Sequence, residues 1–399
     1  MTFKTRLSVL LLSTPVLAFV LIGGLLGNNA AATQDGQIRP LSIFDDVLRL
    51  VLSNYVEEVR IDRAMEGALR GLAEGLDPDS AYLTTEQVKE AAAGTSLADG
   101  EIGVELTRQY YLRVIAARDG SPAAAAGLQT GDYVRAIDGR ATRDMSVYEG
   151  TRLLRGKPGT AVTLTIIRGN AAEPHEVKVE RAKADLPTVS SRMLDQDIGY
   201  VRVPVFAANT AAQLRQHATE LGGKGAKALV VDLRRTAEGD IEHGIAAAKL
   251  FVASGTITSK AGRAAKDAKD APQESITAAA GDGTITLPVQ LLMSAGTSGA
   301  AEVFAAALKG NKRADLIGEH TIGRAAAQRL VKLPEGRGLW LTYARYLTPA
   351  GDPIHATGLK PDVPFDEPDV EFGETLPASD PMLDAALQHA KKILTLKMP

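Results

Sequence analysis

The sequence predicts a multidomain α+β protein in which a helical segment, a small β-rich domain and an α/β core follow one another. Three observations carry this prediction. The length of 399 residues exceeds that of one ordinary domain. The apolar pattern changes from helical spacing to short alternating runs near residue 100, and to alternating strands and helices after about residue 185. Hydrophobic residues make up 45% and charged residues 23%, which excludes disorder over most of the chain.

The composition also excludes several classes of function. The 45 Lys and Arg against 48 Asp and Glu give a net charge of −3, so no broad basic surface for nucleic acid is predicted. The absence of cysteine excludes disulfides, thiolate nucleophiles and thiolate metal sites. The six histidines lack the spacing of metal ligands. We therefore expect neither a metal ion nor another cofactor.

The N-terminus has the pattern of an export signal. Lys4 and Arg6 precede an uncharged apolar stretch over residues 7–26, and small polar residues follow to position 32. The stretch is also long enough to span a bilayer as a helix. Residues 1–32 are thus predicted to be a signal peptide or a membrane anchor. Both alternatives place the rest of the chain in the cell envelope, either in the periplasm or anchored to the inner membrane and facing the periplasm.

A helical module is predicted over residues 41–98. Its first helix carries an apolar stripe at helical spacing, formed by Phe44, Val47, Leu48, Val51 and Tyr55. A second helix ends near Gly75, since Asp77-Pro78 breaks the pattern. A third, alanine-rich helix follows Thr84.

Short β-rich runs then predict a small, partly open β-barrel over residues 100–183. Strands are expected at 112–116, 133–137 and 161–167, where apolar or β-branched residues alternate. The segment 145–155 between them has a helical pattern.

An α/β core is predicted for residues 185–399. Strands are expected at 198–203, 228–233 and 289–293, with helices at 210–221 and 299–308. The run at 228–233 is nearly all apolar, as a parallel strand covered on both faces must be. The segment 260–283 is rich in Ala, Lys, Asp and Gly, and we expect it to be a solvated insertion or lid.

Turn signals in the β-rich domain resemble those of a bacterial PDZ domain. They occur in one order over about 85 residues: Ile102-Gly103-Val104-Glu105-Leu106, Ser121-Pro122-Ala123, Ala126-Gly127-Leu128-Gln129-Thr130-Gly131-Asp132, Ile137-Asp138-Gly139 and Leu154-Arg155-Gly156. The resemblance implies that the first of these segments binds a peptide C-terminus. Its backbone N–H groups would hold the carboxylate, and the strand edge would pair with the peptide.

Residues 41–365 resemble the carboxyl-terminal processing peptidases, also called tail-specific proteases. The resemblance rests on six further segments: Leu76-Asp77-Pro78-Asp79-Ser80-Ala81-Tyr82-Leu83, Ile198-Gly199-Tyr200-Val201, Val231-Asp232-Leu233-Arg234, Gly318-Glu319-His320-Thr321-Ile322-Gly323, Tyr343-Ala344-Arg345-Tyr346-Leu347-Thr348-Pro349-Ala350-Gly351 and Gly358-Leu359-Lys360-Pro361-Asp362-Val363. It implies an exported serine endopeptidase whose PDZ domain captures substrate C-termini and whose general base is a lysine.

The positions of the family's catalytic pair are substituted in this chain. The family serine, aligned on Gly296-Thr297 and Glu302, falls on Gly299, and the family lysine falls on Arg324. The two positions are 25 residues apart, as in the family. The family's orienting glutamine corresponds to Gln328.

These substitutions predict an inactive peptidase. Gly299 has no nucleophilic atom, and the guanidinium of Arg324 is not neutral near working pH, so it cannot be a general base. The oxyanion region comprises Glu238, Gly239 and Ala300, and Glu238 replaces a glycine of the family turn. A carboxylate there would oppose a developing oxyanion.

Ser298 is the alternative nucleophile, with His320 as its conceivable base. The competing interpretation is that Ser298 caps the helix beginning near Gly299. Glu302 can be a partner of that helix's dipole, Arg324 can pair with a carboxylate or anion, and Arg234-Arg235 is expected to be a solvated pair.

The sequence therefore predicts a binding protein that captures C-terminal tails of envelope proteins, with an inactive core as adaptor, scaffold or regulator. One alternative is an active serine endopeptidase that uses Ser298. A third role is association through the helical module, as a homodimer or with an active partner peptidase.

Overall fold

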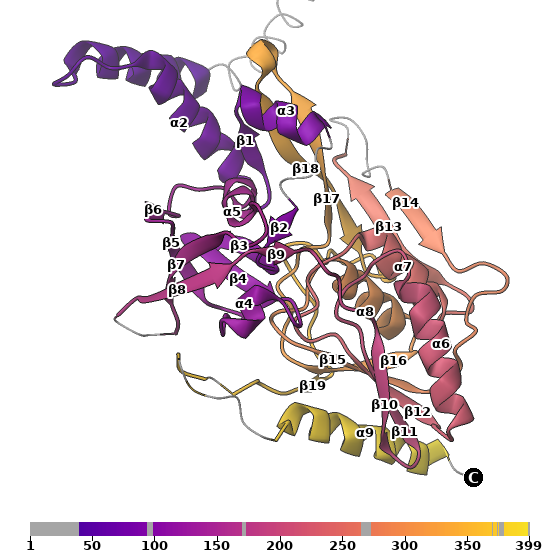
Figure 1. Cartoon of the computed structure of the whole chain (residues 1–399). Coiled ribbons are helices and arrows are strands. Elements are labelled where there is room, and N and C mark those ends of the chain that lie inside the picture. Colours follow the sequence, from indigo (N-terminus) through magenta and orange to yellow (C-terminus); the bar gives the residue numbers. More distant parts are fainter. Residues whose placement is uncertain are drawn as a thin grey trace, which may run out of the picture. The chain divides into compact units, whose positions relative to one another are not determined.

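The computed structural model describes residues 40–93, 99–169, 173–264, 273–368, 370–372, 374 and 379–397 (Figure 1). The predicted signal or anchor at residues 1–32 lies outside the described residues. None of the described helices has both the length and the apolar character required to cross a membrane. The chain divides into two compact units, Met1–Leu69 and Arg70–Pro399.

The described part of the first unit is helical, as predicted. Residues 40–54 form one helix, and α2 (Ile61–Glu74) begins in this unit. The predicted apolar stripe is largely exposed, with 52% of Val47 and 62% of Tyr55 accessible to solvent.

A turn after α2 ends the helical segment. The carboxylate of Asp77 accepts hydrogen bonds from the backbone N–H groups of Asp79 and Ser80 and from the Ser80 hydroxyl. This turn directs the chain into β1 (Ala81–Leu83), which pairs with β18, and α3 (Thr85–Ala93) follows. The predicted helical module thus also contains a strand, because its buried Ala-Tyr-Leu run completes a distant sheet.

The PDZ region forms an open antiparallel sheet in the order β3-β4-β5-β7-β8. Its strands are β3 (Val104–Gln109), β4 (Tyr111–Ala117), β5 (Tyr133–Ile137), β7 (Ala161–Ile167) and β8 (His175–Glu180), with β6 (Arg140–Ala141) beside β5 and with β2 (Gly100–Glu101) paired to β9 (Ala182–Lys183). The three predicted strands are confirmed. Helices α4 (Pro122–Ala125) and α5 (Val147–Leu154) complete the domain. Strand β3 lies at one edge of the sheet.

Close packing of α5 on this sheet requires a glycine. A Cβ atom on Gly150 would lie 2.2 Å from Cδ1 of Leu112, which is fully buried in β4. The predicted helix at 145–155 is therefore confirmed, and its buried side is held directly against the domain core.

The core has the predicted α/β architecture. Its six-stranded sheet has the order β10-β11-β12-β15-β16-β19, in which only β10 runs antiparallel to its neighbour. The strands are β10 (Ser190–Asp195), β11 (Ile198–Arg202), β12 (Ala228–Asp232), β15 (Val289–Met293), β16 (Ala314–Gly318) and β19 (Val363–Pro364). Every residue of β12 is buried, as its apolar sequence predicts.

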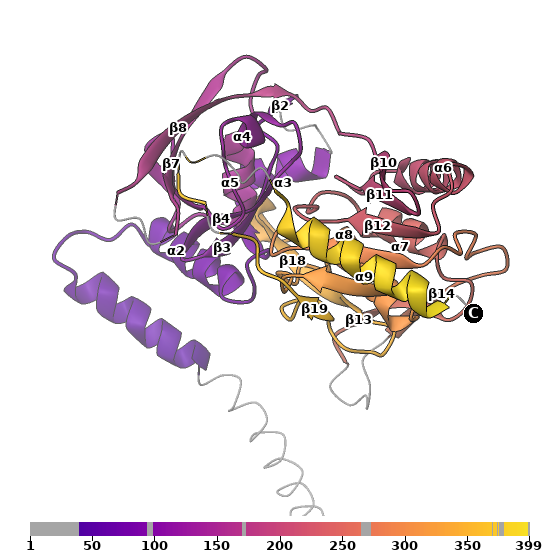
Figure 2. The same cartoon turned by 90° about the horizontal axis from the view of Figure 1, so that it is seen from below.

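Helices cover both faces of this sheet (Figures 1 and 2). Helices α6 (Thr210–Gly223), α7 (Ile241–Lys249) and α8 (Ala300–Gly310) pack on one face, where Leu229 and Val231 point. Helix α9 (Pro381–Lys397) packs on the other face against Val230. The loops that bear the candidate site leave this sheet between its strands and helices.

A second sheet corrects one expectation. Strands β13 (Thr256–Gly262), β14 (Gln273–Thr277), β17 (Ala326–Lys332) and β18 (Gly338–Leu347) form it together with β1, and the short helix η1 (Pro334–Gly336) connects β17 to β18. The segment 260–283 is therefore not simply an insertion or lid. Residues 260–262 end β13, and residues 273–277 form β14, which pairs with β13. Buried polar residues of β13 bond within the sheet, as Thr258 does to the Leu347 carbonyl.

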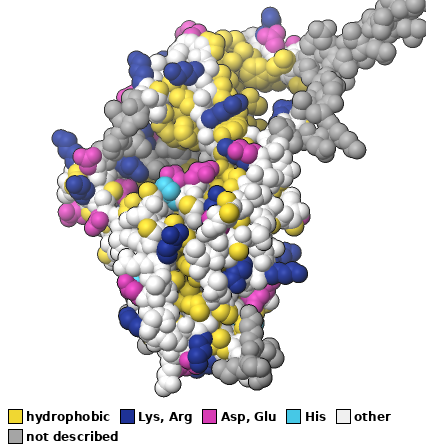
Figure 3. Space-filling model, turned by 90° about the vertical axis from the view of Figure 1, so that its right-hand side faces the viewer, with side chains coloured by type: hydrophobic (Ala, Val, Ile, Leu, Met, Phe, Trp, Pro, Cys, Tyr) yellow, Lys and Arg dark blue, Asp and Glu magenta, His cyan; other side chains and the backbone are white. Residues whose placement is uncertain are grey.

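Charges of both signs are interspersed on the molecular face in Figure 3, and that face carries no large area of one sign.

Candidate functional site

Gly299 lies where a core strand turns into a helix. It is the N-cap residue of α8, directly after the loop that follows β15, and its backbone has φ 61° and ψ −115°. Strained strand–turn–helix junctions of this kind expose the nucleophile in unrelated hydrolases. A Cβ atom at Gly299 would have no neighbour within 4 Å, so the position has room for a side chain but carries none.

Glu302 brings the two substituted positions together. Its Oε2 accepts hydrogen bonds from the N–H of Gly299 at 3.0 Å and from the N–H of Arg324 at 2.8 Å. Because both N–H groups bind the same oxygen atom, the backbones of Gly299 and Arg324 lie close together. This proximity agrees with the alignment that assigned Gly299 and Arg324 to one site.

The same carboxylate also fixes the loop that leads to Arg324. Oε1 of Glu302 accepts bonds from the Thr321 hydroxyl at 2.5 Å and the Gly323 N–H at 2.7 Å. Burial raises the pKa of Glu302, although these donors act in the opposite direction. Glu302 therefore does more than complement the helix dipole, because it clamps the start of α8 to residues 321–324.

Arg324 pairs with two carboxylates, as one interpretation of the sequence anticipated. Its Nη2 lies 2.5 Å from Oδ1 of Asp79, and its Nη1 lies 3.7 Å from Oε2 of Glu105. Burial alone would lower the pKa of Arg324, but Asp79 and Glu105 raise it above its ordinary value. The guanidinium is therefore charged and cannot accept a proton from a nucleophile.

Ser298 is poorly placed for catalysis. Only 2% of it is exposed, and its backbone N–H donates to the Thr236 carbonyl. Among the described residues, no hydrogen bond joins it to His320, whose Nδ1 instead lies 2.9 Å from the Thr321 carbonyl. The prediction that Ser298 caps α8 is also wrong, because Gly299 holds the N-cap position and Glu302 binds its N–H.

Gln328 lies on β17, opposite Thr342 of β18, and its Nε2 is 3.5 Å from the Thr342 hydroxyl. The structure thus places the family's glutamine position in the second sheet.

The predicted oxyanion region lies beside residues 294–299, the loop between β15 and α8. The bond from Ser298 N–H to Thr236 carbonyl connects the two segments. Gly239 has φ 122°, and a Cβ there would lie 2.2 Å from the Phe206 carbonyl oxygen, so this turn requires glycine. Ala300 is buried in the first turn of α8. The side chain of Glu238 adds a carboxylate to this region.

The five predicted peptide-binding residues, 102–106, form what we call the Gly103 loop. Gly103 has φ 74°, and its carbonyl accepts bonds from the N–H of Arg118 and the hydroxyl of Ser121. Ile102 and Leu106 bury their side chains in the domain core, while Val104 begins the edge strand β3. The loop thus carries a positive-φ glycine next to an edge strand, which are the two features on which the prediction of peptide capture rests.

Glu105 turns from this loop toward the core. Burial raises its pKa to about 7, because desolvation outweighs the attraction of Arg324 and because Glu238 and Asp79 repel its charge.

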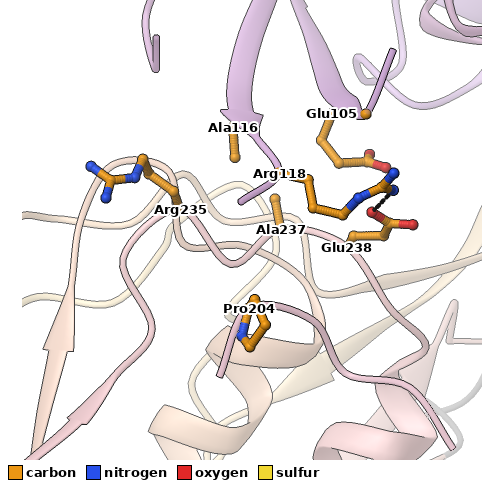
Figure 4. A pocket seen from close by; sticks show the side chains of 8 residues that line it. Glu105, Ala116, Arg118, Pro204, Arg235, Ala237 and Glu238 are labelled. Carbon is orange, nitrogen blue, oxygen red and sulfur yellow. Dashed lines mark hydrogen bonds and ion pairs between the residues drawn. The ribbon is translucent and has the colours of Figure 1, made fainter. Parts of the chain in front are cut away.

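Arg118 connects the Gly103 loop with the oxyanion region, and sequence reasoning missed it. Its Nη1 lies 2.7 Å from Oε2 of Glu238, and its Nη2 lies 2.5 Å from Oε1 of Glu101. Figure 4 shows Arg118 between Glu105 and Glu238, whereas Arg235 turns away. Glu105, Arg118 and Glu238 are among the residues that line a cavity of about 10 Å³, which holds at most about one water molecule. Arg118 and Glu238 are 120 positions apart, so no local pattern indicated the pair.

Arg234 corrects a further expectation. Only 8% of it is exposed, and its guanidinium binds the carboxylates of Asp232 and Asp380. It is a buried connection between β12 and the start of α9 rather than half of a solvated pair.

The described residues contain no group of three or more His, Asp or Glu side chains placed to hold a metal ion.

Comparisons with known proteins identify the family of the chain. Residues 197–365 match peptidase family S41, and residues 113–168 match a PDZ domain. The chain is 31% identical over 350 residues to the carboxy-terminal-processing protease of Bartonella bacilliformis, covering 84% of this chain and 79% of that protein. It is 30% identical over 371 residues to the carboxy-terminal processing protease CtpA of Bacillus subtilis, covering 92% and 78%. The solved photosystem II D1 C-terminal processing protease superposes with a TM-score of 0.68 at 28% identity, covering 80% and 86%. The chain therefore belongs to the carboxy-terminal processing proteases of peptidase family S41 and carries a PDZ domain.

Proposed function

We propose that this chain is a non-catalytic member of its family, which binds the C-terminal tails of proteins in the cell envelope as an adaptor, scaffold or regulator. The observation that carries this proposal is the pair of substitutions in one site. Gly299 occupies the nucleophile position, and the charged Arg324 occupies the position of the base, held by Asp79 at 2.5 Å.

The chemistry of acyl transfer supports the inactive state. A serine–lysine pair needs a hydroxyl to attack and a neutral amine to take its proton. Gly299 supplies no hydroxyl, and Arg324 supplies no neutral nitrogen. The Glu238 carboxylate would also oppose negative charge on a substrate oxygen nearby.

Tail binding is supported by the part of the chain that retains the family's features. The Gly103 loop has a positive-φ glycine, and β3 is the edge strand of its sheet in the described part of the chain, where a peptide strand could add. The names of the relatives refer to carboxy-terminal processing, which is consistent with recognition of chain ends by a PDZ domain.

Export to the envelope is part of the proposal and rests on residues 1–32. Their basic start, apolar stretch and small residues fit a cleaved signal or an anchor in the inner membrane.

A peptidase assay tests the proposal. The protein lacking residues 1–32 should bind an unstructured substrate with a free apolar C-terminus and leave it intact over hours. A catalytically active relative, assayed in parallel, confirms that the substrate can be cleaved. Cleavage at the rate of that relative, abolished by Ser298→Ala, would establish the alternative of an active endopeptidase with Ser298 as nucleophile.

Association with another copy, or with an active partner peptidase, is a second candidate role. It is favoured by exposed apolar side chains on the N-terminal helix, including Leu41 at 68% and Leu50 at 61% exposure. Light scattering of the full chain and of Leu50→Glu tests it, since the substitution should reduce the mass of an assembly formed through this helix.

A further inference from the structure

Three ion pairs join the PDZ domain to the peptidase-like core. Arg118 pairs with Glu238 at 2.7 Å, Asp119 pairs with Arg202 at 2.8 Å, and Glu105 pairs with Arg324 at 3.7 Å. Two of the three core partners, Glu238 and Arg324, are the charged residues that stand at the family's oxyanion turn and base positions.

Arg118 and Asp119 are consecutive residues of opposite charge in the PDZ domain. Arg118 pairs with the core residue Glu238, and Asp119 pairs with the core residue Arg202. A shift of this turn would place like charges together, which is unfavourable, so the arrangement specifies one position of the domain.

The three arginines of these pairs are largely shielded from water, whereas their carboxylate partners are more accessible. The side chains of Arg118, Arg202 and Arg324 are 6%, 11% and 20% exposed, and those of Glu238, Asp119 and Glu105 are 29%, 37% and 38% exposed. Salt screens partly buried pairs less than exposed ones. Removing Arg118 would also take from the partly buried Glu238 the cation that pairs with it.

The same turn is bonded to the Gly103 loop. The N–H of Arg118 donates to the Gly103 carbonyl at 2.9 Å, and Ser121 donates to the same oxygen at 3.1 Å. Any force that holds Arg118 against the core therefore also holds the Gly103 loop there.

Close packing accompanies the ion pairs. Gly296, in the loop between β15 and α8, lies directly against the PDZ domain. A Cβ atom on it would lie 2.7 Å from Oγ1 of Thr130 and 2.9 Å from the carbonyl oxygen of Ile115. The space beside Arg118 and Glu238 is a cavity of only about 10 Å³.

We propose that Glu238 and Arg324, together with Arg202, form the core's half of an ionic lock that holds the PDZ domain and its Gly103 loop over the former catalytic site. The residues that stand at the family's oxyanion-turn and base positions thereby supply contacts that fix the domain. The lock rests on the proposed function for the assignment of these two positions, and goes beyond it because it concerns where the domain lies, which can be measured whether or not tails bind.

The absence of cysteine allows a direct test on the full chain. Spin labels on Lys157→Cys in the PDZ domain and Lys224→Cys in the core, both exposed positions, report the distance between the domains by double electron–electron resonance. The lock variant combines Glu105→Gln with Glu238→Gln. Each arginine then keeps one acidic partner, because Arg324 retains Asp79 and Arg118 retains Glu101.

The otherwise unchanged labelled chain should give one narrow distance distribution, and the lock variant should broaden it or add a second, longer distance. Glu149→Gln is the matched control, since it removes a pair with Arg140 inside the PDZ domain and should leave the distribution unchanged. If the double variant does not fold, Glu238→Gln alone must show a smaller broadening.

A broad distribution in the unchanged chain, or identical distributions in the unchanged chain and the lock variant, would overturn the proposal. Peptidase activity of the unchanged chain would instead refute the proposed function, and the distance measurement would still test the lock by itself.

Discussion

Restoring the catalytic pair is the most demanding test of the site assignment, and the structure shows which changes it requires. Gly299→Ser meets no steric obstacle, since a Cβ has no neighbour within 4 Å. The positive φ of 61° is unfavourable for serine and should cost about 1–3 kcal/mol of stability. That cost is tolerable for a domain of ordinary stability, so the variant should fold.

The base is the harder half of the restoration. Arg324→Lys places an amine next to Asp79, whose carboxylate now lies 2.5 Å from the guanidinium. An opposite charge at such a distance favours the protonated amine and raises its pKa by about 1–3 units. The neutral fraction of the introduced lysine then falls by roughly 10- to 1,000-fold. We therefore expect Gly299→Ser with Arg324→Lys to remain nearly inactive until Asp79→Asn removes that charge.

Glu238→Gly completes the set, because it removes a carboxylate from the oxyanion region. The quadruple variant should cleave a tailed peptide roughly 10- to 1,000-fold faster than the double variant, and a serine-reactive probe should label it. Gly299→Ala with the same three other changes is the matched control, since it carries the backbone strain without the hydroxyl.

Two results would refute this reasoning. Equal activity of the double and quadruple variants would show that Asp79 and Glu238 do not control the site. A quadruple variant that folds and binds peptide, yet neither cleaves nor reacts with the probe, would show that Gly299 and Arg324 are not the catalytic positions.

Three further predictions concern binding and stability. Amidating the C-terminus of a bound peptide should weaken its affinity in isothermal titration, because the Gly103 loop loses a charged acceptor, whereas equal affinities would argue against capture by that loop. The free energy of unfolding should fall as pH rises from about 4.5 to about 7, because the folded state binds the Glu105 proton more tightly than the unfolded chain, and Glu105→Gln should flatten this slope in denaturant titrations. Arg234→Met should destabilise the fold by about 3–5 kcal/mol, because the buried carboxylate of Asp232 loses the guanidinium that binds both its oxygens, and an unchanged denaturation midpoint would contradict this.

Local patterns in the sequence predicted most of the secondary structure. The apolar run of β12 identified a strand covered on both faces, and the alternation in β7 identified a strand with one buried face. Both succeed because burial of one or two faces imposes a period on the sequence itself. The segment 260–283 was misjudged because β13 buries polar and small residues such as Ser259, and because β14 is largely exposed, so neither strand carries an apolar alternation.

The sequence by itself also predicted the substituted site, since the 25-residue interval between Gly299 and Arg324 needs only an alignment. What now surrounds these positions was decided by the tertiary structure. Arg324 pairs with Asp79 across 245 positions, and Arg118 pairs with Glu238 across 120. The sequence shows the same arginine whether water or a carboxylate lies next to its guanidinium in the fold. Its partner is set by which loops the folded sheets bring together, and no local periodicity records that choice.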